Sequence, residues 1–302
     1  DSAGIAIYGN DAAGIAKLTV QSDDADEDFA TLQKDLGHAI DTPVTLRRKD
    51  THAVLEIPAD QALHARHALR ELRPGMRVMS AGNSIEIYKE VGLPKDVAAR
   101  FEVSGMSGSH GIGHTRMATE SAVTTMGAHP FSTGPDQCLV HNGSLSNHNS
   151  LRRKLVRAGV TVETQNDTEV GAAYLTWKMQ QGSTLGEALT SSLDDLDGFF
   201  TFVVGTKDGF GVVRDPIACK PAVIAETDDW AAMSSEFRAI ARLPGAEHAE
   251  IRQALEDKKQ ELTTRLERIH ANLRRGYEAD SKERAKQLED SEVVDALGNE
   301  AR

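Results

Sequence analysis

The sequence changes character near Leu243-Pro244-Gly245, and this change limits the possible folds more than any other feature. Before it, alternating segments and amphipathic segments are interleaved and separated by glycine-rich turns. After it, the chain is dense in charge and its apolar residues recur at helical steps. Such a contrast indicates two regions of different architecture. We therefore expect one domain over residues 1–249 and a helical tail over residues 250–302.

The first region is expected to be an α+β domain. Helices are predicted over residues 27–36, 60–72, 147–158, 167–180 and 185–193, and residues 60–72 have a good amphipathic period. Strands are predicted over residues 4–9, 53–57, 78–88, 111–116, 137–141, 199–205, 209–214, 221–226 and 231–234. Strands stand on both sides of a helical block instead of alternating with helices one by one. This order favours a layered α+β arrangement.

The tail has the pattern of a long helix. One apolar stripe is formed by Ile251, Leu255, Leu262, Leu266, Ile269 and Leu273. This spacing predicts the seam of a coiled coil or of a helical hairpin. Gly276 would interrupt the first helix, and a second helix is predicted from Asp280 to Leu297. The plainer interpretation is a solvated, charged helical face.

Composition excludes several classes of function. A net charge of -12 argues against non-specific nucleic-acid binding and against docking on anionic lipid. No apolar run approaches the roughly 20 residues that a membrane helix needs. Cys138 and Cys219 are too few for a disulfide framework or, by themselves, a structural zinc site. We expect a cytoplasmic protein that binds neither membrane nor nucleic acid directly.

Three widely spaced segments have the character of site loops. Gly113-His114-Thr115-Arg116 ends a predicted strand with a guanidinium, which is suited to hold a carboxylate. His141-Asn142-Gly143 is predicted to form a tight turn at a strand end, with an amide side chain and a backbone N–H as an oxyanion site. In Asn166-Asp167-Thr168-Glu169, Asp or Thr can cap the next helix, and a carboxylate remains to receive an ammonium group.

Together, these segments predict a site for one small molecule. A carboxylate clamp, an oxyanion site and an ammonium acceptor fit an α-amino acid with a scissile side-chain amide. Glutamine is the simplest such ligand. Each segment also has a plainer interpretation: Arg116 as a salt-bridge partner, Asn142-Gly143 as an ordinary turn, and Asp167 as only a helix cap.

The cysteines and histidines can also be explained without a catalytic or metal-binding role. Cys138 and Cys219 are most simply buried structural thiols. His110, His114, His129 and His141 could form a metal site, but no pair has the close helical spacing of zinc hydrolases. A structural or supporting role is favoured, and no metal is expected.

These segments resemble the motifs of class II, or N-terminal nucleophile, glutamine amidotransferases. Asp1-Ser2-Ala3-Gly4 resembles the tail of that family's Arg-Gly-x-Asp-Ser-x-Gly stretch. The three site segments resemble its Arg-bearing, His-Asn-Gly and acidic motifs, in the same order and with similar separations. The resemblance implies a four-layer αββα sandwich over residues 1–249. Within the family, the sequence most resembles the stand-alone subunits of glutamate-synthase-like and N-methylglutamate-synthase-like systems.

The resemblance also implies roles for individual residues. Arg116 would hold the glutamine carboxylate and Asp167 the amino group, while Asn142 and Gly143 would stabilise the tetrahedral oxyanion. The expected substrate-binding set is Arg116, Asp167, His141 and Thr115. The implied activity is release of ammonia from glutamine for a synthase partner, which would be an FMN and iron–sulfur subunit if the finer likeness holds. No cofactor is expected in this chain.

The family's nucleophile has no counterpart in the sequence. It is an N-terminal cysteine whose own α-amino group acts as the base. Asp1 cannot replace it, and neither Cys138 nor Cys219 has a free α-amino group. By resemblance, we expect a preceding segment with this cysteine and one strand of the central sheet. We therefore predict that the polypeptide of residues 1–302 hydrolyses no glutamine.

The tail has a resemblance of its own. Ala279-Asp280-Ser281-Lys282-Glu283-Arg284-Ala285, between two charged helices, resembles the coiled-coil tip of the DksA/TraR transcription regulators. By resemblance, Asp280, Glu283 and Ala285 would be tip residues, with Glu283 in place of the usual Asp. The return helix and the zinc finger of that family are absent from the sequence. The joining of this tail to the first region could be a natural fusion or a junction of two unrelated reading frames.

Two other functions are therefore compatible with the sequence. The chain could be a non-catalytic glutamine-binding or regulatory subunit that keeps the clamp without a nucleophile. It could also be an interaction protein that contacts RNA polymerase through its tail. A terminal cysteine on the native protein would favour the enzyme over the binding subunit, and a polymerase pull-down with a tail-deleted protein would test the interaction.

Overall fold

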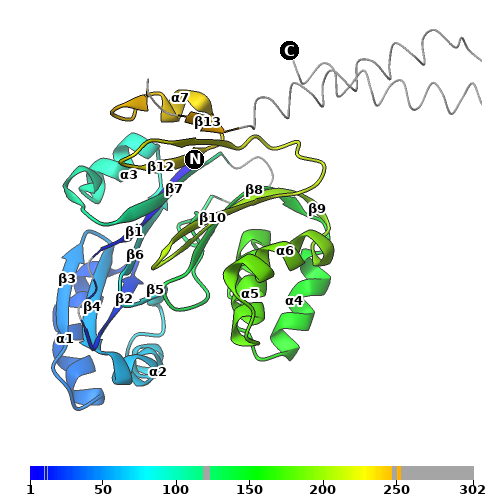
Figure 1. Cartoon of the computed structure of the whole chain (residues 1–302). Helices are drawn as coiled ribbons and strands as arrows, with labels where there is room; N and C mark the ends of the chain where they lie inside the picture. Colours follow the sequence, from blue (N-terminus) through cyan, green and yellow to red (C-terminus); the bar gives the residue numbers. More distant parts are fainter. Residues whose placement is uncertain (10, 12, 118–122, 247–249, 253–302) are drawn as a thin grey trace, which may run out of the picture. The chain divides into compact units, whose positions relative to one another are not determined.

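The computed structural model describes residues 1–9, 11, 13–117, 123–246 and 250–252 (Figure 1). The chain divides into two compact units, Asp1–Pro221 and Ala222–Arg302. This division falls after Pro221, earlier in the chain than the change of sequence character near Pro244. The predicted tail helices and the tip residues Asp280, Glu283 and Ala285 lie outside the described residues.

The described residues of the first unit form three antiparallel sheets (Figure 1). Sheet A has the order β6(Ile85–Val91), β1(Ser2–Tyr8), β7(His110–Arg116). Sheet B has the order β3(Thr45–Lys49), β4(His52–Pro58), β2(Ile15–Gln21), β5(Arg77–Gly82). Sheet C has the order β10(Gly209–Arg214), β9(Gly198–Thr206), β8(Cys138–Leu145), so β8 is an edge strand of this sheet.

Three helices cover one face of sheet C (Figure 1). They are α4(His148–Arg157), α5(Asp167–Gln180) and α6(Leu185–Asp195). Helix α5 is buried along most of its length because it contacts α4, α6 and strand β8 at once. Its N-terminus therefore has a well-defined position beside the end of β8.

The opposite face of sheet C packs against sheet A. Side chains alternate between the two faces of a strand, so Cys138 and Val140 of β8 point towards sheet A. There they join Ala6, Tyr8 and Ile112 in one buried apolar cluster. This cluster holds β7 and β8, the strands of two predicted site segments, on facing sheets.

The other face of sheet A meets sheet B through charged groups and through an apolar cluster that includes Tyr88 of β6 and Val54 of β4. Glu86 of β6 pairs with Lys17 at 3.2 Å and with Arg47 at 2.8 Å. The outer face of sheet B is apolar and is covered by α1(Ala25–Ala39) and α2(Ala62–Leu72), which follows a 3-10 turn, η1(Ala59–Gln61). Beside sheet A lie α3(Pro94–Arg100) and the 3-10 turn η2(Val103–Gly105).

The mixed α/β content agrees with the sequence prediction. The helix predicted over residues 167–180 has those bounds in the structure. The strand predicted over residues 78–88 is instead two strands, β5 and β6, because the Asp136 carboxylate accepts hydrogen bonds from the N–H groups of Asn83, Ser84 and Ile85 and closes a turn. Strands β2 and β3 and helix α3 were not predicted.

The described part of the second unit is a small sheet with one short helix. The sheet has the order β12(Ala231–Ser234), β11(Val223–Glu226), β13(Glu250–Arg252), and the helix is α7(Phe237–Ile240). The prediction that Ile251 begins the helical stripe is wrong, because its backbone pairs with Ala225 of β11. Among the described residues, no helix is both long and apolar enough to cross a bilayer.

Candidate functional site

Strand β7 presents the first predicted site segment. His114 and Arg116 are two residues apart and therefore point to the same face, the face of Ile112, which contacts the core between sheets A and C. Thr115 lies between them and points the other way, and it is exposed. The structure thus brings Arg116 and His114 into the region of the site but directs the side chain of Thr115 away from them.

Strand β8 carries the second segment in a way that the sequence did not predict. The expected tight turn at Asn142-Gly143 is wrong, since both residues lie inside β8 and pair with Thr201 and Phe200 of β9. The turn signal failed because β9 continues the ladder beside these residues. Asn142 points to the side of Cys138 and Val140, whereas His141 points towards α5.

Gly143 has a backbone conformation that suits glycine alone. Its φ is +142°, and a Cβ at this position would lie 2.0 Å from the carbonyl oxygen of Phe199 and 2.8 Å from the Cα of Phe200. Other residues rarely adopt this φ, and neither contact can yield because both partners are backbone atoms. A glycine is therefore required where the sequence analysis placed the oxyanion site.

The direction of the Gly143 N–H follows from the hydrogen bonds of its partner. Phe200 donates to the Asp215 carboxylate at 2.8 Å and accepts from the Asp215 N–H at 2.9 Å, so both of its backbone groups face away from β8. The Gly143–Phe200 pair is then of the type without mutual hydrogen bonds. Because β8 is an edge strand of sheet C, the N–H of Gly143 points outward from that edge.

The neighbouring outward N–H groups of β8 identify what lies along that edge. The N–H of His141 donates to Nδ1 of His129 at 3.5 Å. The N–H of Leu145 donates to Oδ2 of Asp167 at 3.0 Å. Since outward N–H groups recur every second residue, the N–H of Gly143 lies between these two contacts.

The third segment begins helix α5 and places Asp167 beside β8. Asn166 is the N-cap, since its side-chain oxygen accepts the N–H of Thr168 at 2.9 Å; the prediction that Asp167 or Thr168 caps the helix is therefore wrong. Asp167 is freed for other contacts, and its Oδ2 lies 3.8 Å from Nδ1 of His141. A carboxylate in the first turn is also favoured by the helix dipole.

A chain of histidines connects the three segments. The ring of His114 bonds to the backbone of His141 and lies 4.3 Å, centroid to centroid, from the ring of His129. The hydroxyl of Thr168 is 3.1 Å from Nε2 of His129 and 3.2 Å from Nδ1 of His141. Strand β7, strand β8 and the start of α5 therefore meet around His129.

The loop that carries His129 also lies against Arg116. Asn166 donates from Nδ2 to the carbonyl oxygen of Gly127 at 3.4 Å. A Cβ at Gly127 would lie 3.7 Å from Nη1 of Arg116. Gly127 thus lies between the guanidinium of Arg116 on β7 and Asn166, the N-cap of α5. The loop therefore contacts the first and third site segments as well as β8.

Lys89 of β6 holds the loop that carries His129 in place. Its buried ammonium group donates to the carbonyl oxygens of Ala128 at 2.8 Å and Pro130 at 3.2 Å, and it lies 4.3 Å from the ring centroid of Phe131. Gly4 of β1 makes room for the loop, because a Cβ there would lie 2.3 Å from the carbonyl oxygen of His129. Gly4 therefore supports the site.

Sequence reasoning missed His129 as the centre of this network, and it missed Gly127 and Lys89; it named Thr168 only as a possible helix cap. The signal in the sequence is weak. His129 and Gly127 stand in a long loop without periodicity, next to Pro130, and Lys89 is one charged residue in an apolar strand. Their roles depend on contacts between residues far apart in the chain.

Burial keeps the histidines neutral at ordinary pH. It lowers the pKa of His141 to about 4, although Asp167 opposes the shift. It lowers the pKa of His114 to about 4, with Arg116 adding to the effect. The pKa of His129 is also well below its usual value because of burial and the two neighbouring histidines. The network is therefore uncharged around Asp167 and Arg116.

These pKa shifts predict loss of stability in acid. Between about pH 6.5 and the lowered values, the unfolded chain binds protons that the folded chain does not, so the free energy of unfolding falls as the pH falls. Each such histidine lowers the free energy of unfolding by at most about 1.4 kcal/mol for each pH unit in this range. Urea unfolding at pH 7.5, 6 and 5 measures the effect, and His64→Gln, at an exposed position, should leave the pH profile unchanged. Equal stability at pH 7.5 and 5 would contradict the prediction.

The two cysteines lie in different surroundings, and Cys138 is unsuited to nucleophilic attack. Cys138 is fully buried between the sheets, and burial raises the pKa of its thiol to about 11. The hydroxyl of Tyr8 donates to its sulfur at 3.4 Å. Cys219 is exposed, contrary to the expectation of a buried thiol. A thiolate is the reactive form, so Cys138 is inert.

No metal arrangement is found in the part of the chain that the structure describes. There, no three His, Cys, Asp or Glu side chains are grouped as metal ligands. The clustered histidines bond instead to Thr168 and to backbone groups. The arrangement is that of a neutral hydrogen-bonded network between one guanidinium and one carboxylate.

Comparison with known proteins shows the family to which the chain belongs. The family model of a glutamine amidotransferase domain matches residues 102–290. The glutamine amidotransferase-like protein GlxB of Rhizobium meliloti (strain 1021) is 66% identical over 251 residues, which cover 83% of each chain. A relative from Methanothermobacter thermautotrophicus is 41% identical over 161 residues, or 53% of each chain.

The chain therefore belongs to the glutamine amidotransferase domain family. Among solved structures, it is similar to glutamine phosphoribosylpyrophosphate amidotransferase from B. subtilis, with 20% identity and a TM-score of 0.48. That match covers 82% of this chain and 44% of the other.

Proposed function

We propose that this chain is the glutamine-binding part of a class II glutamine amidotransferase, with the N-terminal nucleophile hydrolase fold. It would release ammonia for a synthase partner, which by the finer resemblance is an FMN and iron–sulfur subunit. One observation carries the proposal. The outward N–H of Gly143 lies on the edge of β8 between the Leu145–Asp167 and His141–His129 contacts.

This edge offers the groups that a glutamine substrate needs. Asp167, a quarter exposed, would accept the α-ammonium group, and Arg116 would pair with the α-carboxylate. The N–H of Gly143 and the amide of Asn142 would donate to the oxyanion that forms at the side-chain amide. His141 would contribute a neutral ring beside Asp167, 3.8 Å from its Oδ2, and Thr115 has no part because it points away.

Calorimetric titration of the 302-residue polypeptide tests this proposal. We expect L-glutamine to bind and N-acetyl-L-glutamine, which has no ammonium group, to bind at least tenfold more weakly. L-Glutamine methyl ester, without the carboxylate, should be weakened as well. Equal affinity for all three ligands, or no binding of glutamine, would remove the basis of the proposed site.

The same polypeptide is expected to release no ammonia from glutamine. Cys138 is buried with a raised pKa, and the exposed thiol of Cys219 has no α-amino group as its base. A coupled glutaminase assay measures the release, with Cys138→Ser and Cys219→Ser variants as controls. Turnover that disappears in either variant would show that one of these cysteines is the nucleophile after all.

A further inference from the structure

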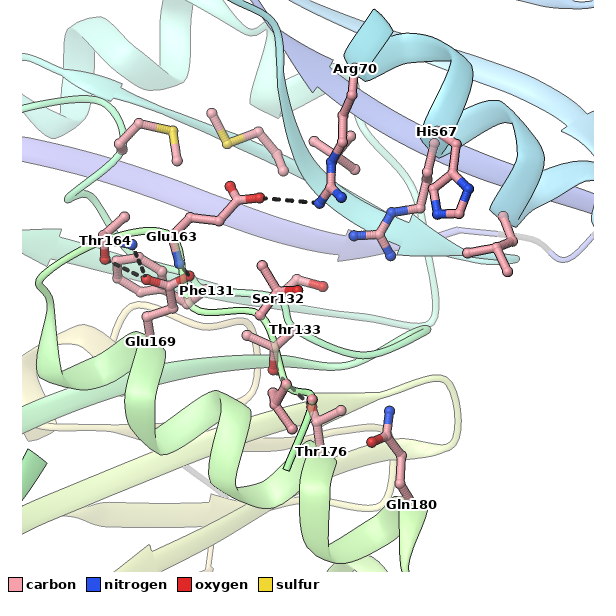
Figure 2. Close-up of a pocket in the computed structure, with 18 of the residues that line it drawn as sticks. His67, Arg70, Phe131, Ser132, Thr133, Glu163, Thr164, Glu169, Thr176 and Gln180 are labelled. Atoms are coloured by element: carbon pink, nitrogen blue, oxygen red, sulfur yellow. Dashed lines mark hydrogen bonds and ion pairs between the residues drawn. The ribbon is translucent and has the colours of Figure 1, made fainter. Parts of the chain in front are cut away.

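A cavity lies next to the loop that carries His129, because Met126 and Phe131, on either side of that residue, line it. Its volume is about 370 Å³. Helix α2 forms one wall, and residues 131–133 and helix α5 form the opposite wall (Figure 2). This volume admits a small organic molecule.

Helix α2 lines the cavity with cations. Arg66 and Arg70 both face it, one turn apart on the helix, together with His67. Arg70 lies 3.6 Å from Glu163, as the dashed line in Figure 2 shows. Arg66 is half-buried, and no described carboxylate is within ion-pair distance of it. Burial and the neighbouring Arg70 lower the pKa of its guanidinium.

The carboxylates of the cavity have other partners. Glu169 accepts hydrogen bonds from the N–H groups of Glu163 at 2.7 Å and Thr164 at 2.6 Å, and from the hydroxyl of Thr164. These contacts fix the turn before α5. Both carboxylate oxygens of Glu169 therefore already accept hydrogen bonds from the protein. Glu163 faces Arg70. Glu163 also acts electrostatically on Arg66, but among the described residues no carboxylate forms an ion pair with the Arg66 guanidinium, which leaves its N–H groups for a ligand.

The opposite wall adds neutral hydrogen-bonding groups. Ser132 and Thr133 come from the loop, and Thr176 and Gln180 come from α5 (Figure 2). Thr133 and Thr176 are joined at 2.8 Å between their hydroxyl oxygens, which ties the loop to the helix. A half-buried guanidinium opposite hydroxyl and amide groups is suited to a small oxygen-rich anion.

We propose that this cavity binds a small carboxylate or phosphate anion through Arg66. Both chemistries share the negatively charged oxygens that a guanidinium fork recognises. The opposing hydroxyl and amide groups complete their hydrogen bonds. The ligand is distinct from glutamine, whose proposed contacts lie along the edge of β8.

The cavity shares structural elements with the proposed glutamine site. Met126 and Phe131 line it, and they flank the loop residues Gly127 and His129 of that site. Glu169 lines it too, one turn or less from Asp167 and Thr168 in α5. An anion that orders this loop and the start of α5 would change glutamine affinity. This coupling rests on the proposed function, whereas the anion binding itself does not.

Anion titrations of the 302-residue polypeptide test the site. The probes are inorganic phosphate and succinate, measured by calorimetry at constant ionic strength with sodium chloride as the blank. We expect at least one probe to bind, and Arg66→Gln to weaken it at least tenfold. Arg66→Lys keeps the charge and the stem but loses the fork, so it should give an intermediate affinity.

A matched variant separates the site from general charge effects. Arg153→Gln removes the same charge from an exposed position on α4 and should leave the affinity unchanged. Hydrogen exchange of residues 126–133 should slow with the bound probe in the wild type and not in Arg66→Gln. The two probes distinguish a phosphate site from a carboxylate site. No binding of either probe, or equal affinity in wild type and Arg66→Gln, would overturn the proposal without bearing on glutamine binding.

Discussion

Gly143→Ala is expected to lower the free energy of unfolding by about 3 kcal/mol and to abolish detectable glutamine binding. The methyl group would lie 2.0 Å from the carbonyl oxygen of Phe199, at a φ of +142°. This close contact can be relieved only if β8 moves away from β9. That movement would displace the N–H of residue 143, which we assign to the oxyanion site. Stability and binding should therefore be lost together.

Gly186→Ala is the matched control for this substitution. Gly186 lies in α6, is exposed, and a Cβ there would meet no atom within 4 Å. Alanine is the better helix former, so this variant should be as stable as the wild type or slightly more stable. Urea unfolding and glutamine titration compare the two variants. If both have wild-type stability, the strained pairing at Gly143 is not present.

Asp167→Asn is expected to weaken glutamine binding by roughly 30- to 100-fold, the loss typical of a charge-assisted hydrogen bond to an ammonium group. The fold should persist, because asparagine keeps an oxygen that can accept the N–H of Leu145, now 3.0 Å from Asp167. Asn166 remains to cap α5. The loss should therefore appear in binding and not in stability.

Two comparisons assign this loss to the ammonium group. N-Acetyl-L-glutamine lacks that group, so its weak affinity should be the same in wild type and in Asp167→Asn. Asp208→Asn, an exposed change between β9 and β10, controls for net charge and should bind glutamine normally. A loss of equal size for both ligands would show that Asp167 acts only on the backbone of β8.

Much of the site could be predicted from short motifs. Arg116, Asn142, Gly143 and Asp167 were recognised because each stands in a segment whose residue types suit one part of an amino acid. The helix predicted over residues 167–180 is α5, with the same bounds. Local pattern is informative there, because these features depend on residues a few positions apart.

The mistakes arise where distant strands decide the geometry. Asn142-Gly143 has the composition of a turn, yet β9 extends the strand through it. Thr115 shares a motif with Arg116 but lies on the other face of β7. The strand β3 has two adjacent arginines and no alternating pattern, and it forms because β4 pairs with it and Glu86 binds Arg47.

The sequence by itself determined the chemical groups of this site and their order along the chain. Tertiary structure decided that they meet around His129, because Lys89 and Gly4 fix its loop against sheet A. It also decided that the N–H of Gly143 points outward, since Asp215 engages Phe200. Both outcomes depend on contacts between residues far apart in sequence, which local periodicity and propensity do not contain.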